Sequence, residues 1–266
     1  MQVKPVMYYK APKYPDKEES LKNPRILLTL PERWRSNAYA AVALSSLLLM
    51  TLTACGDKDS TGENEQYTGQ VAPIFIHGVG RGSFGCVSVA PPAFLSEEEA
   101  FSVIKEEAQR EGIVFTKEAP ALQSVTIPET NLNYADEEEN TGRQKGELAL
   151  DGCDAEKQIA FEFISRDDIY SWAKKNNTVW SSVESFRFLE AAAILAQGLE
   201  GQTEGMQVAV FYDPHYDYAT AEIQDIVNSN TDDFQLMEEK IKERVKADLR
   251  EQVRDFLNWL KGQNII

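Results

Sequence analysis

A run of 17 residues without a charge, from Ala38 to Ala54, limits more than any other feature which part of the chain can form a water-soluble fold. This run is slightly shorter than the about 20 apolar residues that a membrane-spanning helix needs. Arg33 and Arg35 precede it, and a basic flank before a short apolar run is typical of an export signal. We therefore expect residues 38–54 to direct the chain to a membrane and the globular part to follow them.

The end of this run carries a resemblance to a known family. Leu52-Thr53-Ala54-Cys55 is an aliphatic residue, two small residues and a cysteine, and it resembles the lipobox of bacterial prolipoproteins. The resemblance implies that the Cys55 thiol receives a diacylglycerol through a thioether and that cleavage before Cys55 makes it the mature N-terminus. Two acyl chains are enough for stable anchoring. The resemblance thus implies a lipid-anchored protein on the extracytoplasmic side of the cell membrane.

The segments on either side of the run differ in composition. Residues 1–37 contain five prolines and form a longer leader than ordinary signal peptides have. Either translation starts further downstream, or a cytoplasmic tail precedes the signal before cleavage. Residues 55–70 are almost entirely polar, which predicts a flexible tether. Residues 71–266 contain no second linker, so we expect a single globular domain there.

The charge balance of the chain excludes one class of partner. The formal net charge is −16, and the first 55 residues contain eight basic and four acidic residues. That leaves 19 basic and 39 acidic residues from Gly56 onward, a balance of −20. Nucleic-acid binding depends on basic residues that neutralise phosphates, so we expect no nucleic-acid partner. The acidic excess is typical of a well-solvated surface, and it also suits cations or basic partners.

Several segments after the tether predict strands. They are the apolar or alternating residues 74–77, 86–90, 113–116, 125–127, 159–163 and 207–212. Because Gln207–Tyr212 is nearly all apolar, we expect it to be a central strand. In 159–163 large apolar residues alternate with smaller or polar ones such as Glu162, which predicts one buried face. The polar stretch 131–146 predicts an exposed loop.

Capping residues and apolar spacing predict helices between the strands. Ser96 and Glu99 form a capping box at the start of one helix, and Gly112 ends it. Ser165 is the expected N-cap of a second, short helix. A third helix is expected over 183–197.

The C-terminal region has the strongest helical pattern. Glu238–Lys242 and Glu251–Arg254 can pair along its polar side, and Gly262 is a natural stop. The apolar residues recur every three or four positions: Phe234, Met237, Ile241, Val245, Leu249, Val253, Phe256 and Leu260. This stripe packs on the chain's own sheet or forms a partner-binding face. Together the elements predict an α+β fold with a mixed, mainly antiparallel sheet, helices packed against it and a long C-terminal helix.

A glycine-rich segment matches the nucleotide loop of protein kinases. Gly80, Gly82, Gly85 and Val87 have the required spacing, and glycines in such a loop let backbone amides approach phosphates. The lysine that should follow in the next strand is missing, because the next lysine is Lys105, inside an expected helix. We therefore interpret the glycines as a structural loop that allows tight turns or close packing of strands.

Two cysteines remain if Cys55 is lipidated. Cys86 and Cys153 can form a disulfide in an oxidising compartment, and a bridge that closes so long a loop contributes about 3–4 kcal/mol when unstrained. Alternatively, Cys86 is a small buried side chain in a strand. A nucleophilic pair of Cys86 with His77 is a third, weaker interpretation.

A polar cluster follows the strand that we expect to be central. Asp213, His215 and Asp217 alternate along the chain, so their side chains can turn to one side. Two carboxylates and an imidazole are suitable ligands for a divalent cation such as zinc or manganese. The alternative is a turn that Asp213 and Pro214 begin.

These features lead to two functional hypotheses. In the first, the chain is a membrane-anchored extracytoplasmic lipoprotein that acts as a binding or envelope-assembly module of unknown ligand. Its partners are then the lipid bilayer, through Cys55, and an envelope protein. In the alternative, it is an exported hydrolase that depends on a divalent cation held by the 213–217 cluster. The first is favoured because no complete catalytic set is present.

Overall fold

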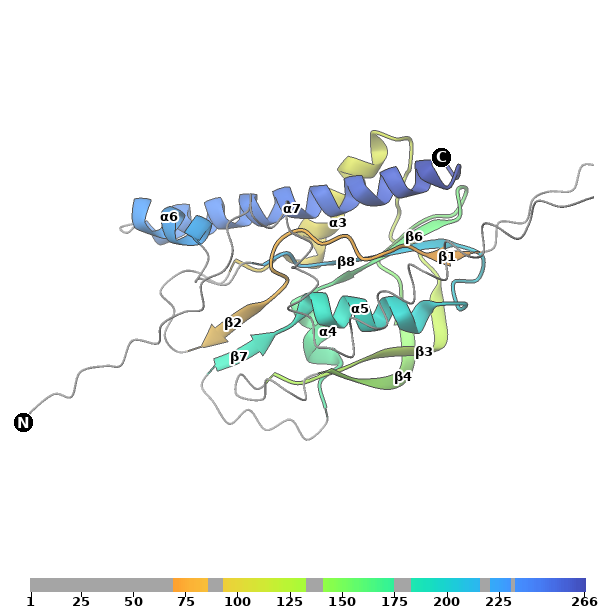
Figure 1. Cartoon of the computed structure of the whole chain (residues 1–266), viewed down its shortest axis with the longest axis horizontal. Coiled ribbons are helices and arrows are strands. Elements are labelled where there is room, and N and C mark those ends of the chain that lie inside the picture. The colour runs from red at the N-terminus through yellow and green to blue at the C-terminus, as the bar shows by residue number, and fades with distance from the viewer. Residues whose placement is uncertain (1–68, 86–92, 133–140, 175–182, 216–220, 231–232) are drawn as a thin grey trace, which may run out of the picture. The chain divides into compact units, whose positions relative to one another are not determined.

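The computed structural model describes residues 69–85, 93–132, 141–174, 183–215, 221–230 and 233–266 (Figure 1). All of them belong to one compact unit, which runs from Gln66 to Ile266. Among the described residues, no helix combines the length and the apolar character that a membrane span requires.

The central sheet has four strands in the order β1-β8-β6-β5. They are β1 (Gln70–Val71), β8 (Gln207–Tyr212), β6 (Ile159–Ile164) and β5 (Gly152–Asp154). The β1–β8 and β8–β6 pairs are parallel, and the β5–β6 pair is antiparallel. Two antiparallel pairs lie outside this sheet: β2 (Gly82–Gly85) with β7 (Val183–Phe186), and β3 (Ala121–Thr130) with β4 (Thr141–Ala149). The predicted α+β class with a mixed sheet is confirmed.

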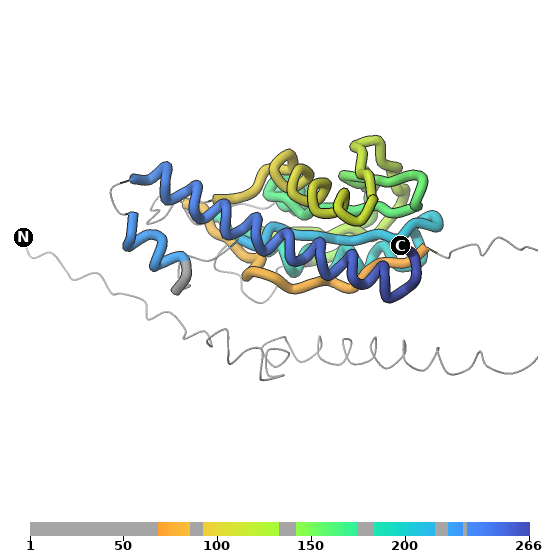
Figure 2. Tube along the Cα trace, turned by 90° about the horizontal axis from the view of Figure 1, so that it is seen from above, coloured from red at the N-terminus to blue at the C-terminus, as the bar shows by residue number. Residues whose placement is uncertain are grey.

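Helices cover both faces of the central sheet (Figures 1 and 2). One face carries α3 (Glu97–Gln109) and α7 (Phe234–Gly262), which run side by side, and α6 (Ala221–Ser229) packs on α7. The other face carries α5 (Phe188–Leu199), and the β3–β4 hairpin packs on the far side of α5. The short helix α4 (Arg166–Ser171) follows β6 directly.

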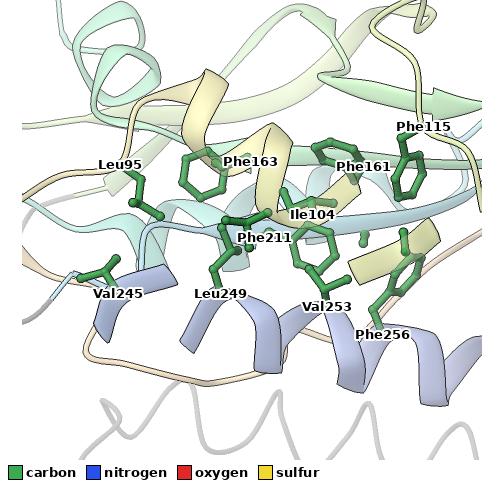
Figure 3. Close-up of a cluster of buried hydrophobic side chains, with 14 of the residues drawn as sticks. Leu95, Ile104, Phe115, Phe161, Phe163, Phe211, Val245, Leu249, Val253 and Phe256 are labelled. Atoms are coloured by element: carbon green, nitrogen blue, oxygen red, sulfur yellow. The ribbon is translucent and has the colours of Figure 1, made fainter. Parts of the chain in front are cut away.

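Each face of the sheet has its own apolar core. Between the sheet and the α3–α7 layer, aromatic rings from β6 and β8 meet aliphatic residues from both helices (Figure 3). Phe161 and Phe211 lie at the centre of this cluster, with ring centroids 5.9 Å apart. On the opposite face, residues of β8, α5, β3 and β4 form the second core. The layers hold together because the two central strands, β6 and β8, have apolar side chains on both faces.

The predicted C-terminal helix is confirmed. Asp233 caps it by accepting a hydrogen bond from the Leu236 amide. The apolar stripe from Met237 to Leu260 is buried against α3 and the sheet, whereas Phe234 at its start is 52% exposed. The stripe therefore packs within the chain. The two predicted ion pairs also form, at 3.7 Å for Glu238–Lys242 and 2.6 Å for Glu251–Arg254.

The predicted starts of α3 and α4 are also confirmed. Ser96 accepts a hydrogen bond from the Glu99 amide, and the Glu99 carboxylate accepts one from the Ser96 amide at 3.0 Å. Ser165 caps α4 in the same reciprocal way with Asp168. Helix α3 ends at Gln109, and Gly112 follows with a φ of +74°, which glycine adopts without strain.

The prediction of a loop over 131–146 is wrong at its C-terminal end, because β4 begins at Thr141. Burial alternates along β4 as in any strand with one inner face. That inner face carries Gly142, Gln144 and Gly146, so no apolar residue marks it before Leu148. Gln144 is accommodated because its amide donates hydrogen bonds to backbone oxygens of Pro128, at 3.0 Å, and Trp172, at 3.2 Å.

Four further predictions are corrected by the structure. Residues 74–77 lie outside every strand, although His77 bonds the Tyr212 hydroxyl at the end of β8. Of residues 113–116 only Thr116 forms a bridge, with Cys153. The helix expected over 183–197 is the strand β7 followed by α5, because its first residues pair with the glycine-rich β2. Strand β6 is buried on both faces and not on one as predicted, and Glu162 is only 2% exposed.

Candidate functional site

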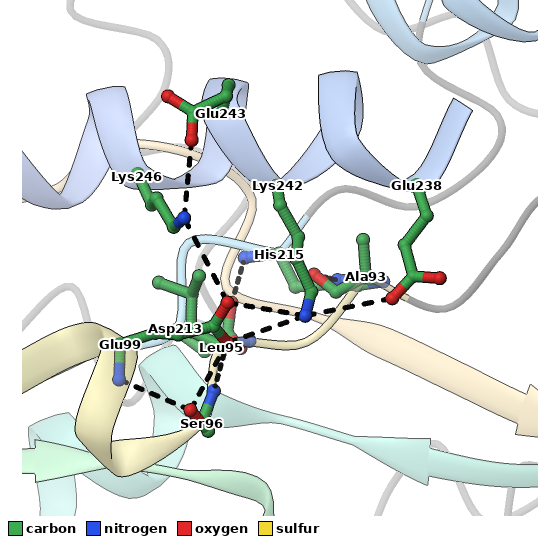
Figure 4. Close-up of polar contacts among 10 residues, drawn as sticks. All are labelled: Ala93, Leu95, Ser96, Glu99, Asp213, His215, Glu238, Lys242, Glu243 and Lys246. Atoms are coloured by element: carbon green, nitrogen blue, oxygen red, sulfur yellow. Dashed lines mark hydrogen bonds and ion pairs between the residues drawn. The ribbon is translucent and has the colours of Figure 1, made fainter. Parts of the chain in front are cut away.

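The candidate site lies at the C-terminal end of β8, where the predicted cluster 213–217 begins (Figure 4). Asp213 is fully buried, and its two carboxylate oxygens accept hydrogen bonds from the amides of Leu95 and His215, both at 2.9 Å. Burial raises the pKa of Asp213 to about 7, although these two hydrogen bonds oppose the shift. The carboxylate thus ties the segment before α3 to the end of β8.

His215 is buried beside Asp213. Its ring stacks on Phe94, with centroids 4.4 Å apart and an angle of 22° between the planes, and its Nδ1 lies 3.4 Å from the Ala93 carbonyl oxygen. Burial lowers the pKa of His215 to about 4, with a smaller opposing effect of the Ala93 carbonyl. The imidazole is therefore neutral at neutral pH, which suits a metal ligand and equally suits a ring packed in a core.

The third predicted ligand, Asp217, lies outside the described residues, so the divalent-cation site stays a prediction. Within the described ranges, no group of three or more His, Cys, Asp or Glu side chains is arranged to hold a metal ion. The atoms of Asp213 that a metal would need already accept hydrogen bonds from backbone amides.

The glycine-rich loop packs directly against this site. An added Cβ at Gly82 would lie 2.6 Å from atoms of both His215 and Phe94, and one at Gly80 would lie 2.7 Å from Leu189 and Tyr212. Gly80 also has a φ of +62°, which L side chains rarely adopt. Both glycines are thus needed for close packing in this structure. Gly85, the third glycine of the motif, is the last residue of β2.

His77 reaches the same end of β8 by its backbone. Its amide donates to the Tyr212 hydroxyl at 3.1 Å, and that hydroxyl donates to the His77 carbonyl oxygen at 3.0 Å. The side chain of His77 instead points to α7, where Nε2 lies 2.8 Å from Asp255. Cys86, considered as a partner of His77 and of Cys153, lies outside the described residues, whereas Cys153 is buried in β5.

A charged pocket lies above this site, and only two of the contacts around it, the capping box at Ser96 and the Glu238–Lys242 pair, were predicted from the sequence. The pocket has a volume of about 320 Å³, and it lies between α7 and the start of α3. Lys242 lies 3.4 Å from Glu99 and 3.7 Å from Glu238, and Lys246 lies 3.2 Å from Glu243 (Figure 4). Burial raises the pKa of Glu99, but the Ser96 amide and Lys242 outweigh it and lower that pKa overall.

The pocket is lined by more acidic than basic side chains. Its residues are Glu99, Gln235, Glu238, Glu239, Lys242, Glu243 and Lys246. Both lysines already contact carboxylates, so the surplus charge that a partner would meet is negative. The only signals in the sequence were the capping box and the Glu238–Lys242 spacing.

Lipidation at Cys55 and the apolar run before it lie outside the described residues. Comparison with protein-family models, with curated proteins and with solved structures found no match to this chain.

Proposed function

We propose that the chain is a lipid-anchored extracytoplasmic protein that acts as a binding or envelope-assembly module. The observation that carries this proposal is the order of segments in the sequence. A basic flank, a 17-residue uncharged run, Leu52-Thr53-Ala54-Cys55 and a polar stretch follow one another, and a folded body comes after them. Each part matches a step of lipoprotein export, and a polar tether would hold the body away from the bilayer.

The chemistry of the candidate site favours binding over catalysis. Asp213 and His215 are buried, and their polar atoms contact backbone groups of the segment before α3. The pocket above them presents carboxylates held by two lysines, on a body whose overall balance is strongly negative. Such a surface suits a partner with positively charged groups. The hydrolase hypothesis has less support, because Asp213 is fully buried and its carboxylate holds two backbone amides, which a catalytic metal would have to share.

Labelling with palmitate tests the anchor. Cells that express the full chain are grown with labelled palmitate, and we expect label on the wild type and none on Cys55→Ala. Cys86→Ala is the matched control, because it removes a cysteine outside the lipobox and should keep the label. Absence of label on the wild type, or its persistence in Cys55→Ala, would refute the proposal.

Two measurements on the full chain purified in detergent separate the functional hypotheses. Capture of an envelope protein at physiological salt, reduced by Glu238→Gln together with Glu239→Gln, supports the binding module. Conversely, one equivalent of zinc or manganese that is lost in Asp217→Asn would support the hydrolase.

A further inference from the structure

Four acidic side chains from separate parts of the chain converge where α3, β6 and α4 meet. They are Glu97 at the start of α3, Asp151 between β4 and β5, Glu162 in β6 and Asp168 in α4, and we call them the carboxyl cluster. Ser165 joins two of them, because its Oγ lies 3.1 Å from Glu97 and 2.8 Å from Asp168. Glu162 experiences the negative charges of the other three members.

The contacts around the Ser165 hydroxyl need one more hydrogen than the hydroxyl itself can donate. The Ser165 Oγ accepts hydrogen bonds from the amides of Asp167, at 3.1 Å, and Asp168, at 3.2 Å. These two bonds use both of its lone pairs, and the hydroxyl has only one hydrogen to donate. Two carboxyl oxygens nevertheless lie within hydrogen-bond distance of it. A proton on the Asp168 carboxyl would supply the missing hydrogen.

Glu162 needs a proton for a separate reason. Its side chain is buried in a strand that is covered on both faces, and its Oε2 has no hydrogen-bond partner among the described residues. An ionised carboxylate with an unpaired oxygen costs far more at such a position than a neutral carboxyl group does. Burial, followed by the charges of Asp151, Asp168 and Glu97, raises the pKa of Glu162 well above its usual value.

The nearby cation Lys117 is shared between the carboxyl cluster and other groups. Lys117 lowers the pKa of Asp151, but its ammonium is paired with Glu98 and lies 5.3 Å from the Phe101 ring centroid. Asp167 adds a further negative charge next to Asp168.

Burial is also the largest cause of the raised pKa in the two half-buried members, Asp151 and Asp168. It raises the pKa of Asp151 to about 7, against the hydrogen bond from the Phe163 amide. It raises the pKa of Asp168 to about 6, against the hydrogen bonds from Ser165. Protons are therefore available to the cluster near neutral pH.

We propose that the carboxyl cluster is a proton-binding site that keeps the junction of α3, β6 and α4 closed, and that this junction opens at α4 when its protons leave. The reciprocal cap formed by Ser165 and Asp168 makes α4 the part that moves. This cap holds the first turn of α4, and Ser165 also makes the contact to Glu97 at the start of α3. Helix α4 has only six residues, so its cap is a large share of what orders it. The proposal does not depend on lipidation, because every member of the cluster lies in the folded body.

Hydrogen exchange of the α4 amides tests this proposal on the full chain in detergent. The amides of Ile169 and Trp172 are followed because they donate the backbone bonds that close α4, to Ser165 at 3.3 Å and Asp168 at 2.9 Å. We expect their protection, corrected for intrinsic exchange, to fall as pH rises from about 4 to about 7, between the ordinary carboxyl pKa and the raised values of Asp168 and Asp151. Each proton released lowers protection by up to about tenfold per pH unit. Protection of the α7 amides should stay constant.

Glu162→Gln provides the decisive comparison, because glutamine has the shape of a protonated glutamate and cannot ionise. We expect the α4 protection of this variant to fall about tenfold less per pH unit than that of the wild type. It should also remove part of the infrared C=O band of protonated carboxyl groups at pH 7. Glu147→Gln, on the exposed side of β4, is the control and should change neither measurement.

Three results would overturn the proposal. One is wild-type α4 protection that does not change with pH, and another is the same pH dependence in Glu162→Gln as in the wild type. The third is recovery of α4 protection at pH 8 on addition of calcium, which would make the cluster a metal site. If Glu162→Gln does not fold, Asp168→Asn is measured instead, and an unchanged pH dependence there would overturn the proposal equally.

Discussion

Replacing Tyr212 with phenylalanine tests how the segment that contains His77 is held to the sheet. The Tyr212 hydroxyl makes two hydrogen bonds, one to the amide and one to the carbonyl oxygen of His77, while its ring is buried in the second core. Tyr212→Phe removes only the hydroxyl. The ring keeps its packing, so any loss of stability comes from the two backbone groups of His77.

The expected loss is about 2 kcal/mol. A hydrogen bond contributes about 0.5–1.5 kcal/mol net, and two are lost. The full penalty for unsatisfied buried groups does not apply, because His77 is only half-buried and water can reach it. The Gln252 amide, 3.5 Å from the His77 oxygen, is too far to replace the tyrosine fully.

Urea unfolding followed by tryptophan fluorescence measures this loss as a lower midpoint at an unchanged slope. Tyr170→Phe is the matched control. Tyr170 is 38% exposed, and its hydroxyl bonds only the Glu184 side chain, so a change within about 0.5 kcal/mol is expected. A Tyr212→Phe variant as stable as Tyr170→Phe would mean that other contacts hold residues 72–81.

Three further changes have defined outcomes. Gly198→Ala would place a Cβ 1.9 Å from a backbone oxygen of β3 and should lower the free energy of unfolding by about 1–3 kcal/mol in chemical denaturation. In the control Gly262→Ala the added Cβ meets nothing within 4 Å and should not destabilise the protein. Equal stabilities of the two variants would contradict the close packing of α5 on β3. Leu249→Ala opens a cavity in the core under α7 and should lower the free energy of unfolding by about 2–5 kcal/mol. Phe234 is exposed, so Phe234→Ala should lower it by less than about 1 kcal/mol. The lowered pKa of His215 means that the unfolded chain binds its proton first as pH falls from about 6.5 to about 4, so stability is lost in that window. His215→Phe should remove that loss when urea unfolding is compared at pH 4.5 and pH 7. A stability difference between the two pH values as large as in the wild type would refute this prediction.

Features that depend on neighbours in the sequence could be predicted. The capping box at Ser96 and the apolar spacing of α7 are local patterns, so both helices were located correctly. The apolar run Gln207–Tyr212 likewise indicated a central strand, and β8 does lie between β1 and β6. In contrast, β4 was missed because glycine and glutamine line its inner face, and only its partner β3 makes it a strand.

The surroundings of the candidate site could not be predicted, because they come from distant parts of the chain. Asp213 was singled out, but its partner amide belongs to Leu95, 118 positions away. His215 was interpreted as a possible metal ligand, and nothing in the local sequence indicated that Phe94 stacks on its ring. The burial of Glu162 depends on the layers that cover both faces of β6, which no local alternation reveals.

The pairing of β1 with β8 has a consequence for how the protein tolerates shortening. Strand β8 is almost entirely apolar. Among the described residues, its edge away from β6 is paired with two-residue β1, with the amide of Ala72, which bonds Val208 at 2.8 Å, and with the Gln252 side chain, which bonds the Tyr212 backbone. Proteolytic trimming past Gln70 would uncover hydrogen-bonding groups along that edge, and such edges invite strands from other molecules. Residues 70–72 therefore protect the sheet from pairing with other molecules. A chain that lacks them should aggregate under conditions in which it is still folded.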